Sequence, residues 1–285
     1  MKISRSGSFL IVAAVYVLAA VCGYWVFGAL EGPVWSRVLL ADIAATVLVF
    51  VFSCLFNNAS VYDPYWSVQP IVILAPMALI YPNMSKLLLL AMVCIWGIRL
   101  TGNWAYTFTG MDHQDWRYTQ LKETSGKLYP FVNLAGTHMF PTLVVFLCVL
   151  PAISVMQEAP AFTPLCLLGF CISIGAVMLQ LVADTQMHNY RKDRRTPFVE
   201  VGLWKNSRHP NYLGEIMMWW GVAVYSVCLL GFRWYLILGA LVNNLMFLFI
   251  SIAMADKRQA KKPGYEEYCR GKNCLIPIRF GKADK

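Results

Sequence analysis

The sequence has little charge for its length. Only 14% of its 285 residues are Asp, Glu, Lys or Arg, and 58% are hydrophobic. A soluble domain carries about 25% charged residues, so this composition excludes an ordinary soluble protein. The apolar residues come in long runs without alternation or heptads, which is typical of polytopic α-helical membrane proteins. The same runs exclude an outer-membrane barrel, because its strands are short and alternate.

Several common site signatures are also missing. The nine cysteines and four histidines show no metal-type spacing, and the cysteines form no disulfide framework. The chain has neither a G-x-G-x-x-G nor a P-loop motif, so any nucleotide would be held without a Rossmann fold or a P-loop. We therefore predict no metal site, and we seek the chemistry in polar residues near the ends of apolar segments.

Eight apolar runs predict membrane spans. They lie near residues 8–30, 35–56, 65–82, 84–108, 131–156, 162–183, 211–231 and 233–255. Three prolines, Pro70, Pro76 and Pro82, interrupt the third run or its boundary with the fourth. The first run is too long for a signal peptide and is interpreted as a retained span. Without repeats or linkers, residues 1–285 are predicted to form a single all-α bundle of seven or eight spans.

The distribution of cations predicts the orientation in the membrane. With eight spans, twenty of the 24 Lys and Arg residues fall on the side that holds both termini, and only Arg37, Lys86 and Arg233 fall on the other. The positive-inside rule then places both termini in the cytoplasm. Because topology accounts for the formal charge of +9, nucleic acid is not an expected partner, and membrane lipids are.

The stretch from Gly202 to Glu215 gathers polar residues at the start of an apolar run. Pro210 suits the first turn of a helix, whose free N–H groups make a site for phosphate. Asn211 and Glu215 are four residues apart and share a helix face. The alternative is a juxtamembrane cap with cytoplasmic cations. The candidate cofactor contacts in this stretch are Arg208, His209, Asn211, Tyr212 and Glu215.

A second polar series begins within the sixth run. It comprises Gln180, Asp184, His188 and Arg191, at steps of four, four and three, which place all four on one helix face. Asp184 can accept from a ribose hydroxyl, and Arg191 can pair with a phosphate. The alternative is a solvated helix end with its own Asp–His–Arg network.

Two further cationic segments lie on the predicted cytoplasmic side. Arg117 in the 109–130 loop is a candidate anion contact, and the tail offers Tyr265 and Tyr268 among lysines. For the tail, binding of lipid headgroups is the alternative.

Asp63 stands before Pro64 at the start of the third run. A carboxyl group in an apolar cavity has a raised pKa, and in its protonated form it can donate to a substrate carbonyl. The alternative is a helix cap, because Asp before Pro is a common helix start.

These elements together resemble a known family. The order Asp-x-x-Trp-Ser, Arg-Tyr, Ala-Asp-x-Gln, Gly-Leu-Trp-x-x-Ser-Arg-His-Pro-Asn-Tyr-x-Gly-Glu and Pro-Gly-Tyr-x-x-Tyr resembles the steroid 5α-reductase-like membrane family, in particular its little-characterised, largely bacterial branch. The resemblance covers roughly residues 60–280, with residues 1–58 as additional N-terminal spans. A looser Arg-His-Pro-x-Tyr pattern also occurs in sterol reductases and in isoprenylcysteine and phospholipid methyltransferases.

The resemblance implies an NADPH-dependent reductase of an activated C=C bond. The substrate would be a lipophilic, steroid- or isoprenoid-like enone that enters from the bilayer, and the bacterial inner membrane is favoured over the endoplasmic reticulum. By position, Gln180, Asp184, Arg191, Asn211 and Glu215 match cofactor contacts. Asp63 falls near the family's substrate-facing acid, and the tyrosine that assists it would be Tyr106 or Tyr62.

Two other functions remain open. The first is a methyltransferase that uses S-adenosylmethionine on a lipid or prenylated substrate; that cofactor carries no phosphate and leaves the cations without a ligand. The second is a non-catalytic lipid-binding protein, which predicts no saturable binding of nucleotides.

Overall fold

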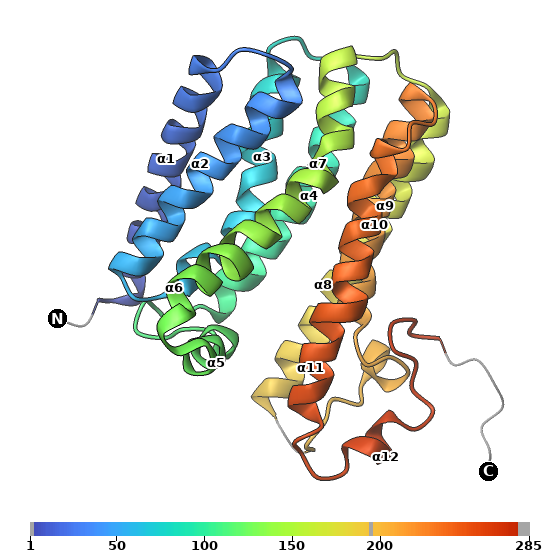
Figure 1. The fold of residues 1–285 in the computed structure, drawn as a ribbon. Coiled ribbons are helices and arrows are strands. Elements are labelled where there is room, and N and C mark those ends of the chain that lie inside the picture. The colour runs from blue at the N-terminus through green and yellow to red at the C-terminus, as the bar shows by residue number, and fades with distance from the viewer. Residues whose placement is uncertain (1–2, 194–195, 279–285) are drawn as a thin grey trace. The chain divides into compact units, whose positions relative to one another are not determined.

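The computed structural model describes residues 3–193 and 196–278, and the part of the chain it describes contains helices and no strand (Figure 1). The cations Lys2, Arg194 and Arg195, and those of the tail beyond residue 278, lie outside these residues. The chain divides into two compact units, Met1–Ala159 and Pro160–Lys285, which are taken one at a time. Whether 1–285 is a single domain stays a prediction.

The predicted spans coincide with helices. Seven helical segments of the described residues are long and apolar enough to cross a membrane. The exception is the third run, where α3 (Tyr65–Leu79) has 15 residues and contains Pro70 and Pro76. At 1.5 Å per residue α3 is about 22 Å long, short of a hydrocarbon core about 30 Å thick. The prediction of an all-α bundle of seven or eight spans is confirmed.

In the first unit, α1 (Arg5–Ala29) packs against α2 (Val34–Leu55), and α3 packs against α4 (Met84–Thr107). Pro76 in α3 has no N–H, so it leaves the carbonyl of Val72 without its helical donor. The hydroxyl of Tyr24 in α1 donates to that carbonyl at 2.6 Å. A proline therefore helps to join α1 to α3.

The 109–130 loop contains the helix α5 (Trp116–Ser125), which Asp115 caps by accepting from the backbone N–H of Arg117. The chain then passes through η2 (Gly126–Leu128), α6 (Tyr129–Val132) and the π-helical η3 (Asn133–Met139) into α7 (Phe140–Glu158). α7 packs against α2, α3 and α4, and Ala159 ends it in the left-handed conformation.

In the second unit, α8 (Leu167–Lys192), preceded by η4 (Pro164–Cys166), packs along α9 (Pro210–Leu230). Three glycines allow this approach, because a Cβ on Gly169, Gly214 or Gly221 would collide with the opposite helix. The predicted helix start at Pro210 is confirmed, with His209 as N-cap.

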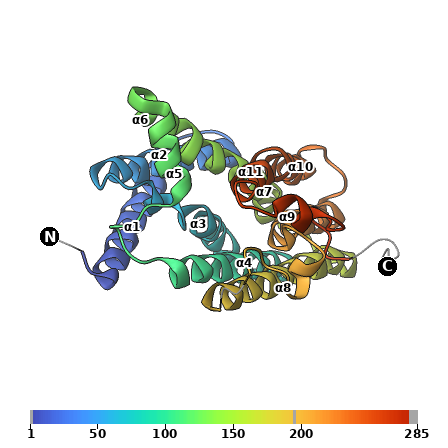
Figure 2. The same cartoon turned by 90° about the horizontal axis from the view of Figure 1, so that it is seen from below.

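The remaining helices follow α9 in Figure 1 and are seen from below in Figure 2. α10 (Tyr235–Met246) continues through the π-helical η6 (Phe247–Ser251) into α11 (Ile252–Gln259), and a turn leads to α12 (Tyr265–Cys269). The last described residues pair with the segment before α9: the N–H groups of Arg208 and His209 donate to the carbonyls of Asn273 and Cys274, both at 3.0 Å.

Candidate active site

Two pairs of polar side chains connect α8 to α9. Gln180 donates through Nε2 to Glu215 Oε2 at 2.6 Å, and one turn further along, Asn211 donates through Nδ2 to Asp184 Oδ1 at 3.5 Å. The other oxygen of Glu215 accepts from the indole of Trp219 at 3.0 Å. From Gln180 to Asp184 the chain moves four residues forward along α8, and their partners, Glu215 and Asn211, lie four residues backward along α9. This order is the one expected of two antiparallel helices.

These pairs leave acceptors over. The Oε1 of Gln180 and the Oδ1 of Asn211 are both buried, and neither has a hydrogen-bond partner among the described residues. A buried amide oxygen without a partner costs about 1–3 kcal/mol. The donors to these oxygens are therefore expected to come from a ligand or from water. The interior face of the α8–α9 pair can accept hydrogen bonds from amide or hydroxyl groups.

At the N-terminus of α9, Asp256 connects three side chains. One carboxylate oxygen accepts from Arg208 Nη1 at 2.6 Å, and the other lies 2.9 Å from His209 Nε2 and also accepts from the hydroxyl of Tyr265. Burial lowers the pKa of His209, whereas Asp256 acts in the opposite direction. The cationic character of this site comes from Arg208, whose Nε is buried without a partner in the described residues.

An aromatic cluster borders this network. The ring of Tyr212 stacks on His209 with centroids 5.2 Å apart, and Phe198 stacks on Tyr268 at 4.6 Å. The rings of Tyr265 and Tyr268 are 6.0 Å apart. These contacts gather aromatic rings from the N-terminus of α9 and from α12, and the hydroxyl of Tyr265 lies 3.4 Å from Arg208 Nη1.

The outer end of the α8 series is more exposed. α8 is unbroken to Lys192, so His188 and Arg191 do continue the face of Gln180 and Asp184. His188 is partly buried and Arg191 is exposed. The predicted contacts from α8, α9 and α12 therefore all lie within the second unit, and their roles towards a cofactor stay predictions.

Asp63 lies in the first unit, between η1 (Ala59–Tyr62) and α3. Its Oδ1 accepts from the hydroxyl of Tyr118 in α5 at 2.6 Å. Burial raises the pKa of Asp63 to about 6, whereas Arg117 and the hydrogen bond from Tyr118 act in the opposite direction. A carboxyl group with this pKa is protonated over part of the physiological range and can act as a general acid.

The structure also places the other predicted residues of this unit. Tyr106 lies near the end of α4 and is 57% exposed, and the hydroxyl of Tyr62 lies 2.8 Å from that of Thr142. Tyr118 donates to Asp63, and an assisting role for Tyr106 or Tyr62 stays a prediction. Arg117 donates to both oxygens of Asp115, from Nε at 2.8 Å and from Nη2 at 3.3 Å, so its guanidinium is partly engaged within the chain.

Sequence reasoning missed two residues of these networks. Tyr118 follows Arg117 in the segment first considered for anion contact. Only the fold brings it to Asp63, with the N–H of Asp115, the cap of α5, donating to Ser60 Oγ of η1 at 3.0 Å. Asp256 is a single acid beside Lys257 and Arg258, and its isolation among cations was a signal that was available.

Comparison with known proteins gives a family. Residues 49–271 match the family described as "Protein of unknown function (DUF1295)". The chain is 25% identical over 217 residues to an uncharacterised protein of Schizosaccharomyces pombe, an alignment that covers 66% of this chain and 62% of that protein. It is 25% identical over 167 residues to human 3-oxo-5-alpha-steroid 4-dehydrogenase 1, covering 54% and 61% respectively.

The macaque protein of the same name is 28% identical over 119 residues, which cover 41% of this chain and 42% of that protein. The chain thus spans less than two thirds of the length of each of these relatives. No solved structure matches it.

Proposed function

The chain belongs to the DUF1295 family, within the steroid 5α-reductase-like group, and on that premise we propose that it is an NADPH-dependent reductase. Its substrate is a lipophilic enone, and the reaction saturates the activated C=C bond. The observation that carries the proposal is the convergence of polar residues from α8, α9, α11 and α12 in the second unit. In that unit, residues that are far apart in the sequence surround the buried amide oxygens of Gln180 and Asn211 and the guanidinium of Arg208.

The residues of the second unit fit the chemistry of NADPH. The amide and the ribose hydroxyls of NADPH donate hydrogen bonds, which the buried side-chain oxygens of Gln180 and Asn211 can accept. Its phosphates need cations, which Arg208 and Arg191 supply, and the aromatic rings of Tyr212, Tyr265 and Tyr268 lie in the same unit. When NADPH is bound, its nicotinamide supplies hydride. The residues named here hold and orient the cofactor.

In the first unit, Asp63 serves as the acid. In its protonated form it donates to the substrate carbonyl, which draws electron density from the β-carbon and favours attack there. Tyr118 holds the carboxyl group in place through its hydroxyl. This arrangement supports a positioning role for Tyr118 and a catalytic role for Asp63.

Binding of cofactors to the purified protein tests the proposal. The ten tryptophans report binding by fluorescence during titrations with NADPH, NADH and S-adenosylmethionine. We expect saturable binding of NADPH. Arg208→Ala and Asn211→Ala are each expected to weaken it about tenfold or more, because each removes a hydrogen bond to a charged or buried group.

Asn189→Ala is the matched control, because Asn189 is exposed on α8 and belongs to neither pair. It is expected to bind NADPH as the wild type does. Binding of S-adenosylmethionine alone would overturn the proposal in favour of a methyltransferase. The absence of saturable binding for all three compounds would favour a lipid-binding protein.

A further inference from the structure

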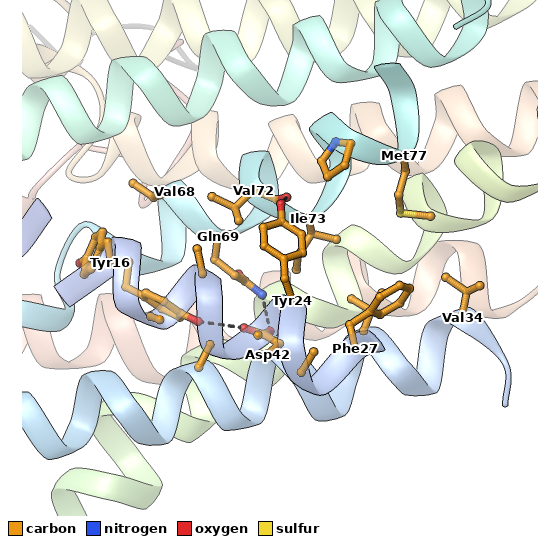
Figure 3. A pocket seen from close by; sticks show the side chains of 18 of the residues that line it. Tyr16, Tyr24, Phe27, Val34, Asp42, Val68, Gln69, Val72, Ile73 and Met77 are labelled. Carbon is orange, nitrogen blue, oxygen red and sulfur yellow. Dashed lines mark hydrogen bonds between the residues drawn. The ribbon is translucent and has the colours of Figure 1, made fainter. Parts of the chain in front are cut away.

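A cavity of about 390 Å³ lies between α1, α2 and α3 (Figure 3). Small residues make the space: Ala19, Ala20 and Gly23 of α1 face Ala41 and Ala45 of α2. Nearly all of the rest of the lining is aliphatic or aromatic. Pockets of roughly 300–1,000 Å³ with apolar walls hold small organic ligands, so the size fits one lipophilic molecule.

One corner of the cavity is polar. Asp42 is 4% exposed and Gln69 is 5% exposed, and both line the space. Tyr65 donates its hydroxyl to Asp42 Oδ1 at 3.2 Å. Gln69 donates its amide Nε2 to Asp42 Oδ2 (Figure 3). Such a polar group within an apolar span is costly, and in membrane proteins it commonly marks a functional site.

Tyr65 and Gln69 both donate to Asp42, and this leaves the amide oxygen of Gln69 without a donor among the described residues. The Oε1 of Gln69 is buried and has no hydrogen-bond partner in residues 3–193 or 196–278. The corner therefore requires a hydrogen-bond donor from whatever fills the cavity.

We propose that this cavity binds a lipophilic alcohol whose hydroxyl group donates to Gln69 at the polar corner. A ketone or an ether brings only acceptors and leaves Gln69 Oε1 unsatisfied. An ammonium group brings three donors and a charge, more than the single orphaned acceptor matches. A hydroxyl brings one donor, and the apolar body of the alcohol fills the remaining space.

The site is independent of the proposed reduction. All the lining residues of α1 and α2 precede residue 49, where the match to the family begins. Neither Asp63 nor Tyr118 lines the cavity, and the predicted cofactor contacts belong to other helices. Binding of an alcohol tests this cavity, and binding of a nucleotide tests the reductase proposal. Either proposal can therefore fail without the other.

Binding of farnesol tests the proposal. Radiolabelled farnesol is titrated against the protein in phosphatidylcholine nanodiscs, with empty nanodiscs subtracted, and competed with unlabelled farnesol or farnesyl methyl ether. We expect farnesol to bind about tenfold more tightly than the ether, because the ether cannot donate to the buried acceptor. Gln69→Leu should abolish this preference, whereas Gln120→Leu, the same change at an exposed position of α5, should keep it.

A second pair of variants tests the cavity without altering its polar corner. Ala20→Phe places a ring in the space and should reduce farnesol binding about tenfold or more, because it removes volume that the ligand needs. Ala13→Phe makes the same change on an exposed part of α1 outside the lining and should bind as the wild type does. Equal affinity for farnesol and its ether, or unchanged binding in Ala20→Phe, would overturn the proposal.

Discussion

At the scale of single residues, the proposed reduction depends on Asp63. Asp63→Asn keeps the shape of the side chain but cannot deliver a proton. We expect it to bind NADPH normally and to reduce an enone about 100-fold or more slowly, the contribution usual for a general acid. Stopped-flow or steady-state loss of NADPH absorbance measures this. Undiminished turnover on an enone that the wild type reduces would remove Asp63 from the mechanism.

Tyr118→Phe removes the hydrogen bond to Asp63 and leaves the ring. We expect a smaller loss of turnover, about tenfold, because the acid remains but is held less well. Tyr81→Phe is the matched control, since Tyr81 lies between α3 and α4 and is 80% exposed. If the two variants have the same kcat, Tyr118 does not position the acid.

The pKa of Asp63 also predicts a pH profile. The protonated acid is the active form, and burial raises its pKa to about 6, so kcat/KM should be constant at low pH and fall as pH rises above about 6. Because the hydrogen bond from Tyr118 lowers the pKa of Asp63, Tyr118→Phe should move this fall to higher pH. A fall that moves to lower pH would contradict the assignment.

At the scale of helices, the contact between α8 and α9 depends on glycine. A Cβ on Gly169 would collide with the backbone of Gly221 and Tyr225, whereas a Cβ on Gly175 in the same helix meets nothing within 4 Å. We expect Gly169→Ala to destabilise the protein by about 1–3 kcal/mol, the usual cost of overpacking. Gly175→Ala should be neutral or slightly stabilising, because alanine favours helix. Thermal unfolding in detergent measures both, and equal midpoints would contradict the close approach.

The helices themselves were predictable, because an apolar run of about 20 residues has few alternatives in a membrane. The short length of α3 could be anticipated from Pro70 and Pro76, but not its packing against α7. The pairs Gln180–Glu215 and Asp184–Asn211 required the relative register of α8 and α9. Spacing along one helix gives a face, and it does not say which residue of the other helix lies opposite.

For the same reason, the partners of charged residues were harder to predict than the residues themselves. Asp63 and Arg208 stood out as polar groups beside apolar runs. Tyr118 and Asp256 reach them from other elements, α5 and α11. Asp256 stands out as an acid beside two cations, but nothing local in the sequence says that it packs against Arg208, or Tyr118 against Asp63.

At the scale of the whole molecule, the cations predict a topology. If α3 crosses the membrane as the eighth span, we expect both termini and the 109–130 loop in the cytoplasm, and the turn at Phe232, between α9 and α10, on the opposite side. Expressed in a bacterium, a C-terminal fluorescent-protein fusion should fluoresce, and alkaline phosphatase fused after Phe232 should be active. A phosphatase that is active at the C-terminus instead would reverse the orientation and place the α9 N-terminus away from soluble nucleotides.

The central claim is that hydride from NADPH reduces a lipid. The purified protein is incubated with a lipid extract and with NADPH deuterated at the transferable position of C4, alongside a parallel reaction with S-adenosylmethionine deuterated in its methyl group. Mass spectrometry then follows the label. The account predicts a lipid that gains one deuterium from NADPH together with one solvent proton. Label that enters lipid from S-adenosylmethionine, or from neither cofactor, would contradict it.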